Sequence, residues 1–66
     1  NGVVTVNSSN MISKITVISV LGEIVKSITA DSKQVIVDIT DLKSNVYFLQ
    51  ITDAKNQTSI KKIVKE

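Results

Sequence analysis

The sequence predicts an all-β fold, a small antiparallel immunoglobulin-like β-sandwich of six to seven strands. Hydrophobic residues make up 42% of the chain but aromatic residues only 3%, so Val, Ile and Leu must fill the interior. Val and Ile are β-branched and favour strands. Apolar and polar residues alternate with the period of a strand, and turn signals recur roughly every ten residues, which favours a sandwich over a doubly wound α/β fold.

Turn signals divide the chain into six predicted strands. The polar cluster 7–10 ends the first, and Gly22 supplies the positive φ angle of a tight hairpin after the second. A loop at residues 30–33, a crossover turn at 41–45 and a polar loop at 53–57 separate the others. The predicted strands are residues 3–6, 15–20, 24–28, 35–39, 46–52 and 58–65.

Two of these strands show which face is expected to be buried. The fourth alternates apolar residues with Asp38, and the fifth places its larger side chains on one face. The residues expected in the core are Val35, Val37, Ile39, Tyr47, Leu49 and Ile51.

Tyr47 stands near the start of the fifth strand. In immunoglobulin-like sandwiches a tyrosine at such a position folds its hydroxyl back to the preceding corner, and a core residue follows two positions later, as Leu49 does here. The alternative is that Tyr47 is simply a large core side chain with its hydroxyl at the rim. With this assignment the chain has no clear first strand of a sandwich, which either lies upstream in a longer parent or does not exist.

Catalytic chemistry has few candidates. The chain has no His and no Cys, which removes the commonest general base, the strongest nucleophile, thiolate metal sites and disulfides, so we expect no catalytic residue, no metal and no cofactor. Asp38 and Asp41 lie close enough in sequence to suggest an acid/base pair or a calcium site. Because an aspartate in a turn ordinarily caps backbone amides, we favour capping by Asp41.

Charge and length limit the partners and the location. The 66 residues fit one small domain, and the net charge of +2, with lysine as the sole basic residue, does not indicate a nucleic-acid partner. No apolar run is long enough to span a membrane, and the residues from Asn1 onward do not resemble a signal peptide. We therefore expect either a cytosolic protein or a piece excised from a longer secreted chain.

The terminal strand carries three lysines and has two interpretations. Lysines commonly protect an edge strand from unwanted pairing, and this is the interpretation that physics alone favours. The alternative is capture of the strand by a partner through β-strand addition. Ile60, Lys62 and Val64 share one face while Ile63 lies on the other, and a bulge would reconcile the two.

Three blocks of sequence together resemble the C-terminal sorting domain of type IX secretion cargo in Bacteroidetes, the Por secretion family. They are residues 15–25, residues 37–49 and residues 61–65, and their order and spacing agree over nearly the whole chain. The resemblance implies that residues 1–66 are a non-catalytic sorting domain, excised from a longer secreted protein such as a proteinase or adhesin.

The resemblance also implies partners and a route. Cargo of this family crosses the periplasm and passes through an outer-membrane translocon to the cell surface or the medium, and a sortase-like peptidase then removes the domain. Residues 46–51 and 61–65 are the segments implied in recognition, and this shifts our interpretation of the terminal lysines towards function. The implied translocon-recognition residues are Lys61, Lys62, Ile63, Val64 and Lys65, and the structural motif comprises Gly22, Asp41, Leu42, Asn45, Tyr47 and Leu49.

The chain departs from the family pattern at several positions. Asn45 replaces a glycine before the tyrosine, and asparagine tolerates the left-handed conformation that the turn would need. Ile18 and Ser19 replace an aromatic and Asp/Asn pair, and Gly2 stands where proline is common.

An immunoglobulin-like adhesion or carbohydrate-binding module is the alternative function. Sugar platforms need exposed aromatics, and only Tyr47 and Phe48 are available, pointing to opposite faces. An exposed edge and a missing first strand also allow a homodimer by edge pairing or strand swapping.

Overall fold

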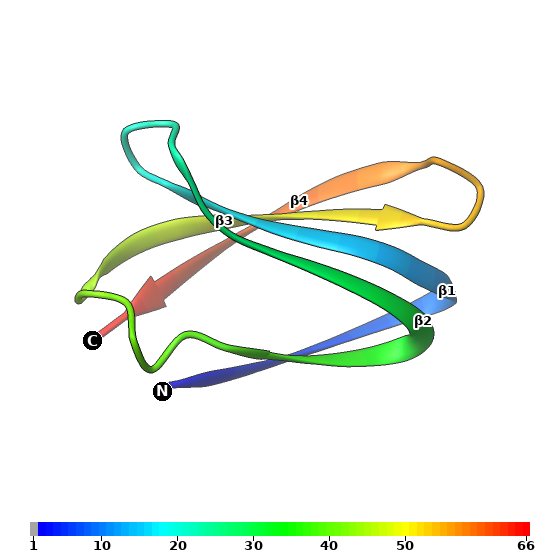
Figure 1. The fold of residues 1–66 in the computed structure, drawn as a ribbon, viewed down its shortest axis with the longest axis horizontal. Helices are drawn as coiled ribbons and strands as arrows, with labels where there is room; N and C mark the ends of the chain where they lie inside the picture. The colour runs from blue at the N-terminus through cyan, green and yellow to red at the C-terminus, as the bar shows by residue number, and fades with distance from the viewer. Residues whose placement is uncertain (1) are drawn as a thin grey trace.

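The computed structural model describes residues 2–66, which form antiparallel strands and no helix (Figure 1). Asn1, the first residue of the segment that was predicted not to resemble a signal peptide, lies outside the described residues. The all-β class is therefore confirmed, and the strands pair in one sheet with the order β2-β1-β3-β4. The strands are β1 (Val3–Ser19), β2 (Ile24–Asp38), β3 (Asn45–Asp53) and β4 (Thr58–Lys65).

Six separate strands were the wrong division, because two of the predicted connections are not turns. Residues 7–10 lie inside β1 and residues 30–33 lie inside β2. Neither segment contains the Gly or Pro that would break an extended chain, so their polar side chains interrupt the ladder without reversing the chain. The pairing of β1 with β2 loses register between Asn7 and Ile12, which is the irregularity that a bulge introduces.

This irregularity folds the long β1–β2 hairpin back over the rest of the sheet. From Ile12 onward β1 pairs with β2 on one side and β3 on the other, whereas its first residues pair with β2 alone. Val6 faces Val35 across that first half, yet both belong to the same buried cluster as Leu49 on β3. Figure 1 shows the blue start of β1 and the green end of β2 running side by side below the remaining strands, and both strands bend at the right of the view.

One aliphatic core results, with Tyr47 as its only aromatic member within the described residues. The predicted core faces of the fourth and fifth segments are confirmed, since all their members are buried except Ile51, which is half-buried. With neither a disulfide nor a cysteine, stability must come from these contacts and from the hydrogen bonds described below. The buried apolar residues are Val6, Ile12, Ile15, Val17, Val35, Val37, Ile39, Tyr47 and Leu49.

Candidate recognition surface

β4 is an edge strand, and its pairing with β3 is regular along its whole length. Lys65 lies opposite Asn45 and Thr58 opposite Thr52, with no register shift between them. The predicted bulge is therefore absent. Because adjacent residues of a strand point to opposite faces, the two sets of apolar residues in β4 stay on different faces.

The inner face of β4 meets the core only near its end. Ile63 lies opposite Tyr47 and packs against the core cluster. Lys61 lies opposite the fully buried Leu49, but its own side chain remains exposed. The outer face carries Ile60 and Val64, which are 68% and 62% exposed.

The three terminal lysines have different environments. Lys65 is half-buried, and its Nζ donates a hydrogen bond of 2.7 Å to the carbonyl oxygen of Leu42. Lys61 and Lys62 are exposed, and neither ammonium group makes a hydrogen bond or ion pair within residues 2–66. Lys65 is thus committed to the protein, whereas Lys61 and Lys62 are available to a partner.

The corner that accepts Lys65 is residues 39–44, between β2 and β3. Its backbone is held by the hydroxyl of Tyr47, which donates to the carbonyl oxygen of Lys43 at 2.7 Å. This is the back-folded hydroxyl that the sequence predicted, and the ring itself is only 6% exposed. The amide of Leu42 donates to the carbonyl of Ile39 at 3.0 Å and closes the turn.

Asp38, not Asp41, caps this corner, so the predicted capping residue was wrong. The Oδ1 atom of Asp38 accepts hydrogen bonds from the Thr40 hydroxyl at 2.7 Å and from the Thr40 amide at 3.0 Å. These two bonds, with a smaller contribution from the charge of Lys26, hold the pKa of Asp38 below its ordinary value of 3.8. Asp41 instead forms an exposed ion pair with Lys26, whose Nζ lies 3.1 Å from Asp41 Oδ1.

Gly22 and Asn45, two other predicted motif residues, differ from each other in backbone conformation. Gly22 has a φ angle of +89°, which confirms the tight hairpin turn. Asn45 has no positive φ angle; it begins β3, and its own Oδ1 accepts the Val46 amide at 2.8 Å. The left-handed asparagine is Asn56, with a φ angle of +63°, in the β3–β4 turn.

Sequence reasoning missed the role of Asp53, which begins the predicted polar loop 53–57 and in the structure ends β3. Its side chain is only 8% exposed. Oδ1 accepts the Lys55 and Gln57 amides, both at 2.9 Å, and Oδ2 accepts the side-chain amide of Asn10 at 3.2 Å. The Gln57 amide, followed by the Lys55 amide and Asn10, lowers the pKa of Asp53, although burial of the carboxylate opposes the shift. A spacing of two and four residues from an aspartate to turn amides was the signal that could have revealed it.

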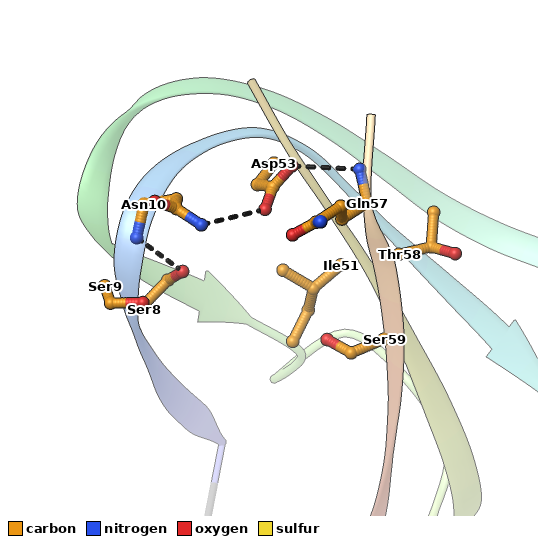
Figure 2. Close-up of a pocket in the computed structure, with 8 residues that line it drawn as sticks. All are labelled: Ser8, Ser9, Asn10, Ile51, Asp53, Gln57, Thr58 and Ser59. Atoms are coloured by element: carbon orange, nitrogen blue, oxygen red, sulfur yellow. Dashed lines mark hydrogen bonds between the residues drawn. The ribbon is translucent and has the colours of Figure 1, made fainter. Parts of the chain in front are cut away.

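Asp53 closes one end of an open, polar hollow of about 230 Å³ (Figure 2). The hollow separates the middle of β1 from the start of β4, and Ile51 lies at its centre. In the described part of the chain, no buried side-chain nitrogen or oxygen lacks a hydrogen-bond partner, so the hollow has no unpaired buried polar atom in its lining. The lining residues are Ser8, Ser9, Asn10, Ile51, Asp53, Gln57, Thr58 and Ser59.

A comparison of the sequence with models of protein families identifies the family of this chain. The model of the secretion system C-terminal sorting domain matches residues 1–66, the whole of the sequence. The chain belongs to this family. No curated protein and no solved structure gives a significant match.

Membership of the sorting-domain family shows the general function of the domain. The domain is a C-terminal sorting signal of type IX secretion, a role that is not itself catalytic. Such signals belong to proteins that are exported to the cell surface or secreted, and they interact with the secretion machinery. The described residues form no helix that could cross a membrane.

Two hairpin turns of this sorting domain are capped in the same way. The hydroxyl oxygen of Ser19 accepts the amides of Leu21 at 3.3 Å and Glu23 at 3.2 Å in the β1–β2 turn. Asp53 makes the same two bonds, to the residues two and four positions later, in the β3–β4 turn. The Ser19 hydroxyl therefore makes in the first turn the contacts that the Asp53 carboxylate makes in the second.

Proposed function

We propose that the secretion machinery recognises this sorting domain through β4, and that the residues concerned are Lys61, Lys62, Ile63, Val64 and Lys65. The family match supports the role, and the position of β4 at the sheet edge supports the site. Within the proposed site the residues have different roles. Lys61 and Lys62 contact the partner, while Ile63 and Lys65 hold β4 against the core and the corner.

The remaining motif residues have a structural part in this proposal. Gly22 permits the β1–β2 turn, and Leu49 fills the core. The corner is maintained by the carbonyl of Leu42 and the hydroxyl of Tyr47; Asp41 lies within the corner, and Asn45 follows it at the start of β3. These residues present β4 without contacting the machinery.

The proposed route begins in a longer secreted parent protein, whose C-terminal domain is residues 1–66. The parent is exported to the periplasm, and the domain then directs it through the outer-membrane translocon. A sortase-like peptidase removes the domain at the surface. We expect an immunoglobulin-like sandwich to be completed by strands beyond the four seen here, which the open edges of the sheet would accommodate.

The test is export of a reporter fused in front of residues 1–66 in a bacterium with a working type IX system. Removing Lys61 to Glu66 would also remove most of β4, so a loss of export would not separate recognition from folding. Lys61→Glu/Lys62→Glu changes two exposed side chains and keeps the strand. We expect the reporter to stay in the periplasm with this variant and to reach the surface or medium with the unchanged domain.

Lys33→Glu/Lys43→Glu is the matched control, because it makes the same change in net charge at exposed lysines outside β4. Circular dichroism and urea unfolding of the purified domains verify that both double variants fold. Normal export of the folded Lys61→Glu/Lys62→Glu variant would contradict the proposed recognition site.

This fold does not expose the aromatic side chains that an adhesion or carbohydrate-binding role would need. Tyr47 is buried and its hydroxyl is bonded to the corner, which leaves only the half-buried Phe48 to stack on a sugar. Self-association remains part of the proposal, because two edges of the sheet are open. Light scattering at high protein concentration would detect such a homodimer.

A further inference from the structure

The outer face of β3 and β4 presents an apolar strip with one charge at its centre. Val46 lies opposite Val64, Phe48 opposite Lys62 and Gln50 opposite Ile60. Val46 and Phe48 on β3 are half-buried, and Ile60 and Val64 on β4 are largely exposed. We call this surface the docking strip; it comprises Ile60, Lys62 and Val64 on β4 and Val46 and Phe48 beside them on β3.

The electrostatic character of this edge is positive on both faces. Lys61 and Lys62 are consecutive, so one ammonium projects to each side of the strand. Residues 45–52 and 58–65 contain no acidic residue to offset them. The nearest carboxylate on β3 is Asp53, which is buried and already accepts three hydrogen bonds.

This charge pattern argues against a second copy of the chain at β4. Two β4 strands paired antiparallel about Lys61 and Lys62 would place lysines opposite lysines, and like charges directly opposite each other are destabilising. A homodimer would therefore use the other edge strand, β2. The apolar residues beside the lysines nevertheless distinguish β4 from a purely protective edge, since protection alone does not require exposed Ile60 and Val64.

We propose that β4 accepts an extended segment of another protein as a fifth strand, and that this segment carries two adjacent carboxylates between apolar residues. One carboxylate would face Lys62 and the other Lys61, while apolar side chains would cover Ile60 and Val64. Main-chain hydrogen bonds would supply affinity, and the alternating side chains would supply specificity. The inference rests on the proposed function, because the secretion machinery is the source of the segment.

The direct test uses the purified domain and synthetic peptides, without any export. The probe is an eight-residue peptide with two adjacent glutamates between valines, and the matched peptide has lysines in place of the glutamates. We expect the acidic peptide to shift the backbone NMR signals of β4 and to bind at least tenfold more tightly than the lysine peptide. With Lys61→Glu/Lys62→Glu the preference should reverse, and with Lys33→Glu/Lys43→Glu it should persist.

A second variant tests the apolar part of the strip. Ile60→Ser/Val64→Ser keeps both lysines and changes only exposed side chains, so the fold should persist and binding should fall at least fivefold. Equal binding of both peptides to the unchanged domain, or shifts confined to β2, would overturn the inference.

The export assay separates this inference from the proposed function. If Lys61→Glu/Lys62→Glu blocks export but the acidic peptide does not bind, the sorting role stands and strand addition is wrong. If the peptide binds as expected and the variant is exported normally, β4 accepts such strands but sorting does not use them.

Discussion

The Nζ atom of Lys65 donates to the carbonyl oxygen of Leu42 at 2.7 Å and thereby ties the last strand to the corner before β3. The two residues are 23 positions apart in sequence. Replacing Lys65 with Met keeps an unbranched side chain of similar length but removes the donor. We expect a loss of about 1 kcal/mol in the free energy of unfolding, measured in urea, because the bond is charged but only partly buried.

Lys61→Met and Lys62→Met are the controls for Lys65, since both side chains are exposed. Each should change the free energy of unfolding by less than about 0.5 kcal/mol. Equal effects at all three positions would show that Lys65 does not hold the strand.

Tyr47→Phe tests the second bond to the corner. The ring stays in the core, whereas the carbonyl oxygen of Lys43 loses its donor at 2.7 Å. The expected loss is about 1 kcal/mol. Combining the change with Lys65→Met should give a non-additive loss, because both side chains hold adjacent carbonyl groups of the same turn. Strict additivity in urea unfolding would mean that the two bonds act independently.

The two hairpin turns provide a third prediction. Asp53 is followed four residues later by Gln57, whereas Ser19 is followed by Glu23, whose charge would repel a carboxylate at position 19. We therefore expect Ser19→Asp to stabilise the domain by about 0.5–1 kcal/mol at pH 7 when it is made together with Glu23→Gln. The reference is Glu23→Gln alone, and Ser19→Ala should cost about 1 kcal/mol. A destabilised double variant would contradict the equivalence of the turns.

Acid should weaken the fold through Asp38 and Asp53. Hydrogen bonds lower the pKa of both carboxyl groups below 3.8 in the folded state, so the unfolded chain binds protons first as the pH falls. The stabilisation that the two carboxylates contribute is complete above the unfolded-state pKa of 3.8. It is lost as the pH decreases through their lower pKa values in the folded state. Urea unfolding between pH 6 and pH 2 should show this loss, with a shallower slope for Asp38→Asn and for Asp53→Asn. Unchanged slopes would contradict the assignment.

The last prediction concerns Gly2 and Thr40. A Cβ atom at Gly2 would overlap the Thr40 methyl group, which cannot rotate away without breaking the bond from the Thr40 hydroxyl to Asp38. Gly2→Ala should therefore destabilise the domain by about 1–2 kcal/mol. Thr40→Ser removes the methyl and keeps the hydroxyl, so it should restore most of that loss in thermal unfolding. A mild effect of Gly2→Ala that Thr40→Ser does not change would show that the corner can move.

The sequence predicted local features of this fold better than its long-range ones. The Gly22 turn, the buried faces of β2 and β3 and the back-folded hydroxyl of Tyr47 all follow from residue type and spacing along one segment. The continuity of β1 and β2 through residues 7–10 and 30–33 did not, because polar residues are equally compatible with a turn and with a bulged strand.

The candidate site was predictable to a similar extent. The family resemblance indicated the terminal block, but only the structure shows that Lys65 bonds to the corner while Lys61 and Lys62 stay exposed on opposite faces of β4. The contacts of Asp53 with Asn10 and of Lys26 with Asp41 join residues 43 and 15 positions apart, and no local pattern reports such contacts.

The alternation of Lys61 and Lys62 across β4 exists only while that strand is paired with β3. An unfolded tail would contain the same lysines, but it would not hold them on opposite sides at a fixed separation beside Ile60 and Val64. A receptor that reads the pattern would thus ignore cargo whose last domain is unfinished or damaged. Recognition of this pattern would thus act as a checkpoint, because the pattern forms only when the domain has folded.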